Sequence, residues 1–312
     1  MKSTLAIDIG ASRMRAASYT TKSIESIQYN QIPTRSEGMP IEDRLVHLIE
    51  TVWPEDYEVT AIAAACPGPL DPFNGIVVEP PNIPEWKYFP LQEFLATTFD
   101  VPAAINNDAN LAALGEWSFG AGKGFSDLIY LTISTGIGGG FIIDNKLLLG
   151  TSGFAGEVGH MSVIPQGPAC NCGKEGHLEA IASGPAIVRW IKSRLEEDSL
   201  RDHFPEGELT AKHISDAAEA GNELAIAAYE RAGKYIGLAI ADLVHIFNTS
   251  LIIIGGGVSR AGDLLFDPIR RSVTNSVISD VYLDNFQILP AALGDDSGLM
   301  GALVLSREIA SS

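Results

Sequence analysis

Asp108 stands in a polar run, from Asn106 to Asn110, that directly follows a short apolar segment. Phosphoryl transfer to a hydroxyl needs a carboxylate within hydrogen-bond reach, because the hydroxyl must lose its proton as the new bond forms. Asp108 has the right chemistry for this general base. Asp is also a common N-cap, here for a helix expected from Ala109 to Trp117, so the run alone leaves both interpretations open.

Two glycine-containing turns could hold phosphate through backbone N–H groups. Gly10 to Ser12 joins strands predicted at 5–9 and 14–19, and Thr135 to Gly140 joins strands predicted at 128–133 and 141–143. The two segments align over a short stretch, which indicates an internal repeat, although two unrelated hairpins could give the same pattern. The second turn is the stronger phosphate candidate, with a bulged hairpin as its alternative. Neither turn is a Walker A motif.

Four nitrogen and sulfur donors lie close together in the sequence, namely His160, Cys170, Cys172 and His177. Structural Zn²⁺ takes four such ligands in a tetrahedron. The segment is rich in Gly and Pro and poor in apolar residues, so some other element must stabilise it. Free thiols beside surface histidines are the alternative. Two thiols one residue apart, in a chain with three cysteines, suit a reducing compartment better than a disulfide framework.

Glu157 and Glu179 flank this segment. If His160 binds a metal through one ring nitrogen, its other nitrogen is directed to a neighbour such as a sugar hydroxyl. Isolated glutamates are more often simply solvated. Gly255 to Gly257 follows another predicted strand and indicates that backbone approaches closely at that strand end.

The order of apolar patterns predicts an α/β protein of two domains. Further strands are expected at 59–65, 251–254 and 286–289. Helices are expected at 41–52, throughout most of 181–247 (the last one from 224), at 261–273 and at 297–307. Residues 67–90 are rich in Pro, Gly and Asn, which predicts a long loop that either covers a cleft or lies on the plain surface.

The composition excludes several classes of protein. With 312 residues, 46% of them hydrophobic, the chain can bury a large core. A net charge of −18 without a basic patch disfavours nucleic acid as a partner. The apolar start is broken by Asp8, and no stretch is long enough to cross a bilayer, so we expect a cytoplasmic protein with no membrane partner.

These motifs together resemble the ROK family (repressors, open reading frames and sugar kinases), in particular its glucokinase and N-acetylmannosamine kinase branch. The segment 153–160 is similar to the family's Glu-x-Gly-His sugar signature, and 170–179 is similar to its zinc motif. Other segments resemble the family in order along essentially the whole chain: 67–68, 81–86, 107–110, 134–139, 254–257 and 293–298.

The resemblance implies a two-lobed, actin-like fold of the ribonuclease H type, with ATP between the phosphate hairpins and sugar in an interlobe cleft. The small lobe would comprise 1–116, completed by a C-terminal helix at about 296–312. The large lobe would comprise 117–295 and carry a zinc-binding loop at 160–177. We also expect a homodimer or a dimer of dimers.

Site roles follow from the resemblance position by position, with Asp108 as the base. The residues implied to bind sugar are Gly68, Asn82, Asn107, Asp108, Glu157, His160 and Glu179. Those implied to bind ATP and Mg²⁺ are Asp8, Gly10, Ser12, Thr135, Gly136, Gly138, Gly139, Gly255, Gly256 and Gly257, with Asp8 on the metal. The implied structural Zn²⁺ ligands are His160, Cys170, Cys172 and His177.

Two positions depart from the family pattern. Ala11 replaces a glycine of the first phosphate loop, which puts the use of ATP in question because a Cβ hinders close approach and positive φ. His177 replaces the third cysteine of the zinc motif, a change that zinc tolerates.

The expected reaction is ATP-dependent conversion of glucose to glucose 6-phosphate. An N-acetylhexosamine kinase, acting on N-acetylmannosamine or N-acetylglucosamine, is the nearest alternative. A sugar-sensing module with weak kinase activity is another. The first strand is expected by about Thr4, which leaves no room ahead of it for a DNA-binding helix-turn-helix.

Overall fold

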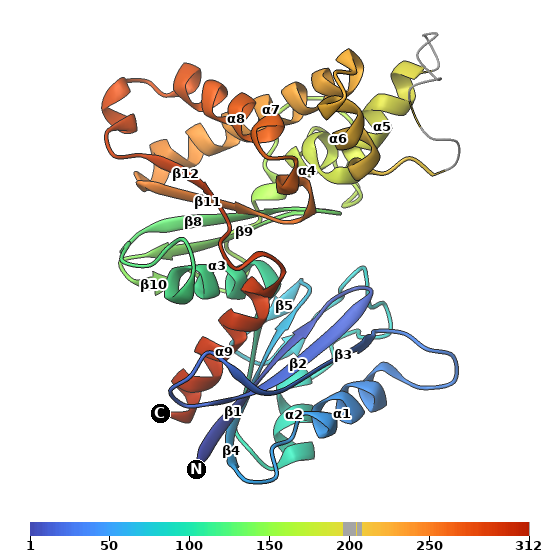
Figure 1. Ribbon diagram of the computed structural model, residues 1–312, viewed down its shortest axis with the longest axis vertical. Helices are drawn as coiled ribbons and strands as arrows, with labels where there is room; N and C mark the ends of the chain where they lie inside the picture. The colour runs from blue at the N-terminus through green and yellow to red at the C-terminus, as the bar shows by residue number, and fades with distance from the viewer. Residues whose placement is uncertain (196–203, 205–207, 312) are drawn as a thin grey trace. The chain divides into compact units, whose positions relative to one another are not determined.

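The computed structural model describes residues 1–195, 204 and 208–311 (Figure 1). The chain divides into two compact units. One consists of Met1–Ser126, Gly140–Gly156 and Ala292–Ser312, and the other of Asp127–Gly139 and Glu157–Ala291. The predicted lobe boundary at 116 falls inside a helix, Asp108–Phe119. Because a continuous helix stays in one unit, the first unit extends past the predicted boundary.

The first unit contains a five-stranded sheet of order β3-β2-β1-β4-β7. β2 pairs antiparallel with β1 and β3, whereas β1, β4 and β7 run parallel. The strands are β1 (Lys2–Ile9), β2 (Arg13–Thr20), β3 (Ser26–Pro33), β4 (Glu58–Cys66) and β7 (Ala103–Asn107). The predicted hairpin through Gly10 and the strand at 59–65 are therefore confirmed.

Alternation along β1 places successive side chains on opposite faces of this sheet. Leu5, Ile7 and Ile9 enter an apolar core together with side chains of α1 (Ile41–Thr51) and α2 (Leu91–Phe99). The opposite face meets α9 (Ser297–Ala310), where Ser306 Oγ donates to Thr4 Oγ1 at 2.9 Å. Figure 1 shows α9 and the pair α1–α2 on different sides of the sheet.

The predicted loop at 67–90 is partly structured. It contains the short antiparallel strands β5 (Leu70–Asp71) and β6 (Ile76–Val77). Its Trp86 is fully buried, and its indole N–H donates to Glu42 Oε1 at 2.7 Å. The segment is thus anchored to the core through an aromatic side chain, which composition alone could not indicate.

Helices α3 (Asp108–Phe119) and α9 pack with their backbones unusually close together. A Cβ on Gly301 would lie 1.7 Å from the Leu111 carbonyl oxygen, and one on Gly115 would lie 2.3 Å from the Ser297 carbonyl oxygen. Only glycine fits at these two positions. The contact fixes the start of α9 against α3.

The second sheet has the order β10-β9-β8-β11-β12, which repeats the topology of the first. Again the outer pair is antiparallel, and β8, β11 and β12 run parallel. The strands are β8 (Leu128–Ile133), β9 (Ile137–Ile143), β10 (Lys146–Leu147), β11 (Leu251–Gly255) and β12 (Gln287–Pro290). The two glycine turns occupy equivalent places, between β1 and β2 and between β8 and β9, as the internal repeat predicts.

The remaining helices belong to the second unit: α4 (Leu178–Ala182), α5 (Gly184–Leu195), α6 (Ala211–Glu219), α7 (Glu223–Phe247) and α8 (Asp263–Ser276). α7 and α8 lie side by side over one face of the second sheet (Figure 1). Asn222 caps α7 by accepting from the Ala225 N–H at 2.9 Å, and Asn248 ends it in the left-handed conformation. Both ends of this helix match the prediction.

Candidate active site

Asp108 is the first residue of α3, at the point where β7 ends. The N-cap is Asn107, whose side chain accepts from the Ala109 N–H at 2.9 Å. Asp108 is therefore not the cap, although its Oδ1 also accepts from the Ala109 N–H at 2.8 Å. Its side chain is exposed, and the partial positive charge of the helix N-terminus stabilises its negative charge. This leaves a fixed but accessible carboxylate.

The turn after β4 lies against the same asparagine. A Cβ on Gly68 would come within 2.9 Å of Asn107 Nδ2, so a larger residue here would displace the Asn107 side chain. Gly68 and Asn107, which are both predicted to bind sugar, therefore lie next to each other. Asn82 lies in an exposed turn further along, where its carbonyl accepts from Arg35 at 3.0 Å.

Cys66, at the end of β4, is fully buried. Burial raises the pKa of its thiol well above the ordinary value, and the Asp108 and Asp8 carboxylates raise it further. A thiol held in its neutral form is a poor nucleophile. Cys66 therefore serves packing beside the two carboxylates.

The first glycine turn is stabilised by its own backbone and by a neighbouring strand end. Gly10 N–H donates to the Arg13 carbonyl at 2.9 Å, and Thr34 Oγ1 donates to the Gly10 carbonyl at 2.6 Å. Ala11 is exposed and does not adopt a positive φ. The departure from glycine at this position consequently causes no backbone strain.

Asp8 has a partner that the sequence analysis did not identify. Arg15 lies directly opposite Asp8 in the β1–β2 register, and its Nε donates to Asp8 Oδ2 at 3.1 Å. The two residues are equidistant from the hairpin turn, and this symmetry was the available signal. Arg15 also donates to Asp296 Oδ1 at 2.9 Å, close to the start of α9.

The four predicted zinc ligands come together in the second unit, where their ligand atoms all lie within 4.8 Å of one another and could hold a metal ion. The two histidine Nδ1 atoms are 3.3 Å apart. Cys172 Sγ is 3.3 Å from His177 Nδ1, and Cys170 Sγ is 3.8 Å from His160 Nδ1. The predicted grouping of these four side chains is present.

Two glutamates connect this cluster to neighbouring segments. His160 turns its other ring nitrogen, Nε2, toward Glu157 Oε2 at 3.9 Å. Burial raises the pKa of Glu157, His160 opposes the shift, and Glu179 adds to it. Glu179 Oε2 accepts from the Ile137 N–H at 3.0 Å, and a Cβ on Gly136 would lie 2.6 Å from that oxygen. Glu179 thus links the second glycine turn to the His/Cys cluster.

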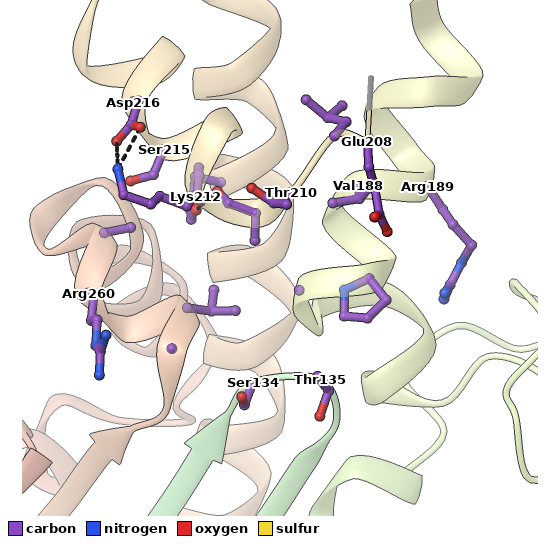
Figure 2. Close-up of a pocket in the computed structure, with 18 of the residues that line it drawn as sticks. Ser134, Thr135, Val188, Arg189, Glu208, Thr210, Lys212, Ser215, Asp216 and Arg260 are labelled. Carbon is purple, nitrogen blue, oxygen red and sulfur yellow. Dashed lines mark hydrogen bonds and ion pairs between the residues drawn. The ribbon is translucent and has the colours of Figure 1, made fainter. Parts of the chain in front are cut away.

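A cavity of ≈ 840 Å³ opens beside the second glycine turn (Figure 2). Ser134 and Thr135 line it from the end of β8, and Gly257 lines it from the end of β11. Gly256 has φ +86°, and a Cβ there would lie 2.4 Å from the Ile133 carbonyl oxygen, so the two strand ends meet closely. Two of the segments predicted to bind ATP therefore border one pocket.

The rest of the pocket comes from residues that the sequence analysis missed. α5 contributes Val188 and Arg189, and α6 contributes Lys212, which pairs with Asp216 at 2.7 Å. Arg260 reaches the pocket from the segment after β11 (Figure 2). The side chains from α5 and α6 belong to ordinary amphipathic helices, Arg260 belongs to the 3-10 helix Gly257–Ala261, and none of them carried a motif. Their mixture of apolar wall and charged rim suits a nucleoside phosphate.

Two five-stranded sheets of one topology, each opening on a glycine turn, define the actin-like ATPase fold. The chain belongs to the ROK family, whose profile matches residues 4–309.

Individual relatives agree with this membership. The glucokinase of Streptomyces coelicolor is 35% identical over 98% of both chains. A solved ROK family glucokinase from Streptomyces griseus, in complex with glucose and AMPPNP, is 35% identical with a TM-score of 0.83, covering 98% of this chain and 99% of the other. The xylose repressor of Caldicellulosiruptor bescii is 35% identical over 79% of this chain and 62% of its own length. Among the described residues, no helix is long and apolar enough to span a membrane.

Proposed function

We propose that this protein transfers the γ-phosphoryl group of ATP to the 6-hydroxyl of glucose, giving glucose 6-phosphate. The observation that carries the proposal is the exposed Asp108 carboxylate, fixed at the N-terminus of α3 in a chain 35% identical to glucokinases over nearly its whole length. The nucleotide-sized pocket beside the second glycine turn supports it.

In this mechanism Asp108 accepts the proton of the attacking hydroxyl as its oxygen bonds to phosphorus. The hydrogen bond from the Ala109 N–H to Oδ1 holds the carboxylate in place, and the exposed side chain is accessible to the hydroxyl. Holding both reactants in line supplies much of the rate enhancement in phosphoryl transfer.

The remaining sugar hydroxyls are assigned to the other residues of the predicted set. Asn107 and Gly68 adjoin each other in the first unit, and His160 adjoins Glu157 in the second. Glu179 Oε2 accepts from the Ile137 N–H, and Oε1, which lies 3.9 Å from Cys170 Sγ, is the oxygen offered to sugar. Asn82 completes the set with its exposed amide.

ATP is assigned to the glycine turns and the pocket. Gly10, Ser12 and the segment from Thr135 to Gly139 offer backbone N–H groups to phosphates. Gly255 to Gly257 and the walls formed by α5 and α6 suit the nucleoside. Because the whole chain is acidic, phosphate binding depends on these local N–H groups and on Mg²⁺ rather than on a basic field.

Mg²⁺ is assigned to Asp8. Magnesium keeps several of its waters and is usually bound through one or two carboxylates plus substrate phosphates. Asp8 Oδ2 is occupied by Arg15, but Oδ1 accepts no hydrogen bond among the described residues and is free to meet a bound water. When bound, the ion neutralises charge on the phosphates.

The His/Cys cluster is assigned a structural zinc ion. Zn–N bonds of about 2.0–2.1 Å and Zn–S bonds of about 2.3 Å give tetrahedral edges of about 3.3 Å between nitrogens and about 3.6 Å between nitrogen and sulfur. The observed N–N separation is 3.3 Å, and the N–S separations for Cys172–His177 and Cys170–His160 are 3.3 and 3.8 Å. Two histidines and two thiols form a closed ligand set, so the ion would stabilise the 160–177 segment rather than react.

About one equivalent of zinc is expected to copurify with the protein, because the four donors form a complete site. Metal analysis by mass spectrometry should show loss of zinc when Cys170 and Cys172 are both replaced by Ala. Cys66→Ala is the matched control and should keep its zinc, since Cys66 lies in β4 of the other unit. Zinc-free wild-type protein, freshly purified without chelators, would contradict the assignment.

The proposed reaction is tested by ADP release with glucose, N-acetylmannosamine, N-acetylglucosamine, mannose and fructose. Glucose is expected to give the highest kcat/KM. A higher value for an N-acetylhexosamine would assign the other kinase activity, and sugar binding without ADP release would assign a sensing role. A nuclear magnetic resonance spectrum of the product identifies the phosphorylated hydroxyl.

A further inference from the structure

The guanidinium of Arg15 is buried among three aspartates next to the first glycine turn. The Arg15 residue is 6% exposed. It lies directly opposite Asp8 in an antiparallel pair, so both side chains project from the same face of the sheet. That face is the one covered by α9, because a Cβ on Gly298 would lie 3.6 Å from Asp8 Oδ1.

Each nitrogen of the guanidinium donates to an acidic residue. Nε and one terminal nitrogen both donate to Asp8 Oδ2. The other terminal nitrogen donates to Asp296 Oδ1 at 2.9 Å. The nitrogen shared with Asp8 also donates to the Asp295 carbonyl. Arg15 therefore binds the carboxylates of Asp8 and Asp296 at once.

The two carboxylate oxygens of Asp8 differ in their hydrogen bonds. Both hydrogen bonds from Arg15 fall on Oδ2, and Oδ1 accepts none among the residues that the structure describes. Burial lowers the pKa of Arg15, but the neighbouring Asp8 and Asp296 carboxylates outweigh burial and raise it. The cation is consequently permanent, and no change of pH in the physiological range removes it.

We propose that Arg15 is a positioning residue that blocks Asp8 and Asp296 from binding a divalent cation by themselves and presents only Asp8 Oδ1 to a nucleotide-bound metal. The proposal rests on the assignment of Mg²⁺ to Asp8 in the proposed function. Without Arg15, Asp8 and Asp296 would lose the cation that they share, and two carboxylates are a ligand set that hard divalent ions take. With Arg15, the metal must arrive together with the phosphates of ATP.

The test measures metal binding directly, with Mn²⁺ as a paramagnetic probe and with neither sugar nor nucleotide present. Zinc-loaded wild-type protein and Arg15→Met are titrated and followed by electron paramagnetic resonance. Methionine keeps the length of the side chain but removes its charge. We expect Arg15→Met to bind Mn²⁺ about ten-fold or more tightly than the wild type, because a cation between the carboxylates has been removed.

Three further variants identify the site and guard against a failure to fold. The double variant Arg15→Met/Asp8→Asn is expected to lose the added Mn²⁺ site. Arg15→Lys keeps the charge and is expected to bind Mn²⁺ as weakly as the wild type, whereas Arg15→Gln, a second neutral variant, should behave as Arg15→Met does. A merely structural role would not create a metal site in both neutral variants.

Addition of AMPPNP tests the second half of the proposal. The wild type is expected to form a bound Mn²⁺–AMPPNP complex that Asp8→Asn weakens. Equal Mn²⁺ affinity in the wild type and both neutral variants without nucleotide would overturn the proposal, as would an unchanged complex in Asp8→Asn. If the wild type phosphorylates no sugar, the proposed function fails, but the nucleotide-free titration still decides whether Arg15 blocks the carboxylates.

Discussion

Replacing Asp108 by Asn is expected to lower kcat for glucose phosphorylation by about 10²–10⁴-fold, while the dissociation constant for the sugar changes little. The amide has the same shape as the carboxylate, and its oxygen can still accept from the Ala109 N–H as Asp108 Oδ1 does. It cannot take a proton from the hydroxyl. The loss therefore falls on the chemical step rather than on binding.

The measurement pairs steady-state ADP release with calorimetric titration of glucose. Asp43→Asn is a matched control, because Asp43 is also an exposed acid in the first turn of a helix of the same unit, α1. It should leave kcat unchanged. Undiminished turnover in Asp108→Asn would show that another group accepts the proton, and a large rise in the sugar dissociation constant would make Asp108 a binding residue first.

The elements that could be predicted are those whose signal is local. β1, β4 and β11 are short apolar runs bounded by turn residues, and α7 combines helical periodicity with an Asn at each end. In these cases the pattern and the burial agree, because the three strands are buried on both faces and read as apolar runs, whereas α7 buries one face. The repeated glycine turn likewise indicates the two equivalent hairpins from sequence alone.

The elements that were missed lack such a signal. β3 is an edge strand whose residues are mostly exposed and polar, so only its ladder with β2 defines it. α2 has nine residues and follows a proline-rich segment. The pocket walls in α5 and α6 are ordinary helix surfaces, which become a site only because the end of β8 at 134–135 and the short 3-10 helix Gly257–Ala261 face them.

In the candidate site, too, residues with a local sequence signal could be predicted and residues with distant partners could not. The His/Cys cluster could be found because its donors lie within one segment, and Asp108 could be proposed because a polar run breaks an apolar one. Arg15 and its aspartates could not, because Asp296 is 281 positions away from Arg15. A partner so distant is chosen by the fold, and a single sequence does not record it.

Glu116 is the clearest case of a residue whose role depends on distant partners. It is fully buried in α3, and both carboxylate oxygens are used. Oε1 accepts from the Leu293 N–H at 2.8 Å and from Ser297 Oγ at 2.9 Å. Oε2 accepts from the Ala121 and Ala292 N–H groups at 2.9 and 3.1 Å. One carboxylate thus holds the segment that leads into α9.

Glu116→Gln is expected to destabilise the protein by about 3 kcal/mol, because the amide nitrogen must face N–H donors wherever it points. At least one buried backbone N–H is then left without an acceptor. The held segment also carries Asp296, which binds Arg15, and Arg15 binds Asp8. We therefore expect kcat to fall as well, with the nucleotide KM rising.

Urea unfolding followed by circular dichroism measures the first effect, and ADP release measures the second. Glu50→Gln makes the same chemical change at an exposed position of α1 and should alter neither quantity. If Glu116→Gln had the same urea midpoint of unfolding as the wild type, the four hydrogen bonds of Glu116 would contribute little to the stability of the protein. A loss of stability with unchanged kcat would instead mean that the aspartates near Arg15 are held in place by α9 itself, through the close contact of Gly301 with Leu111.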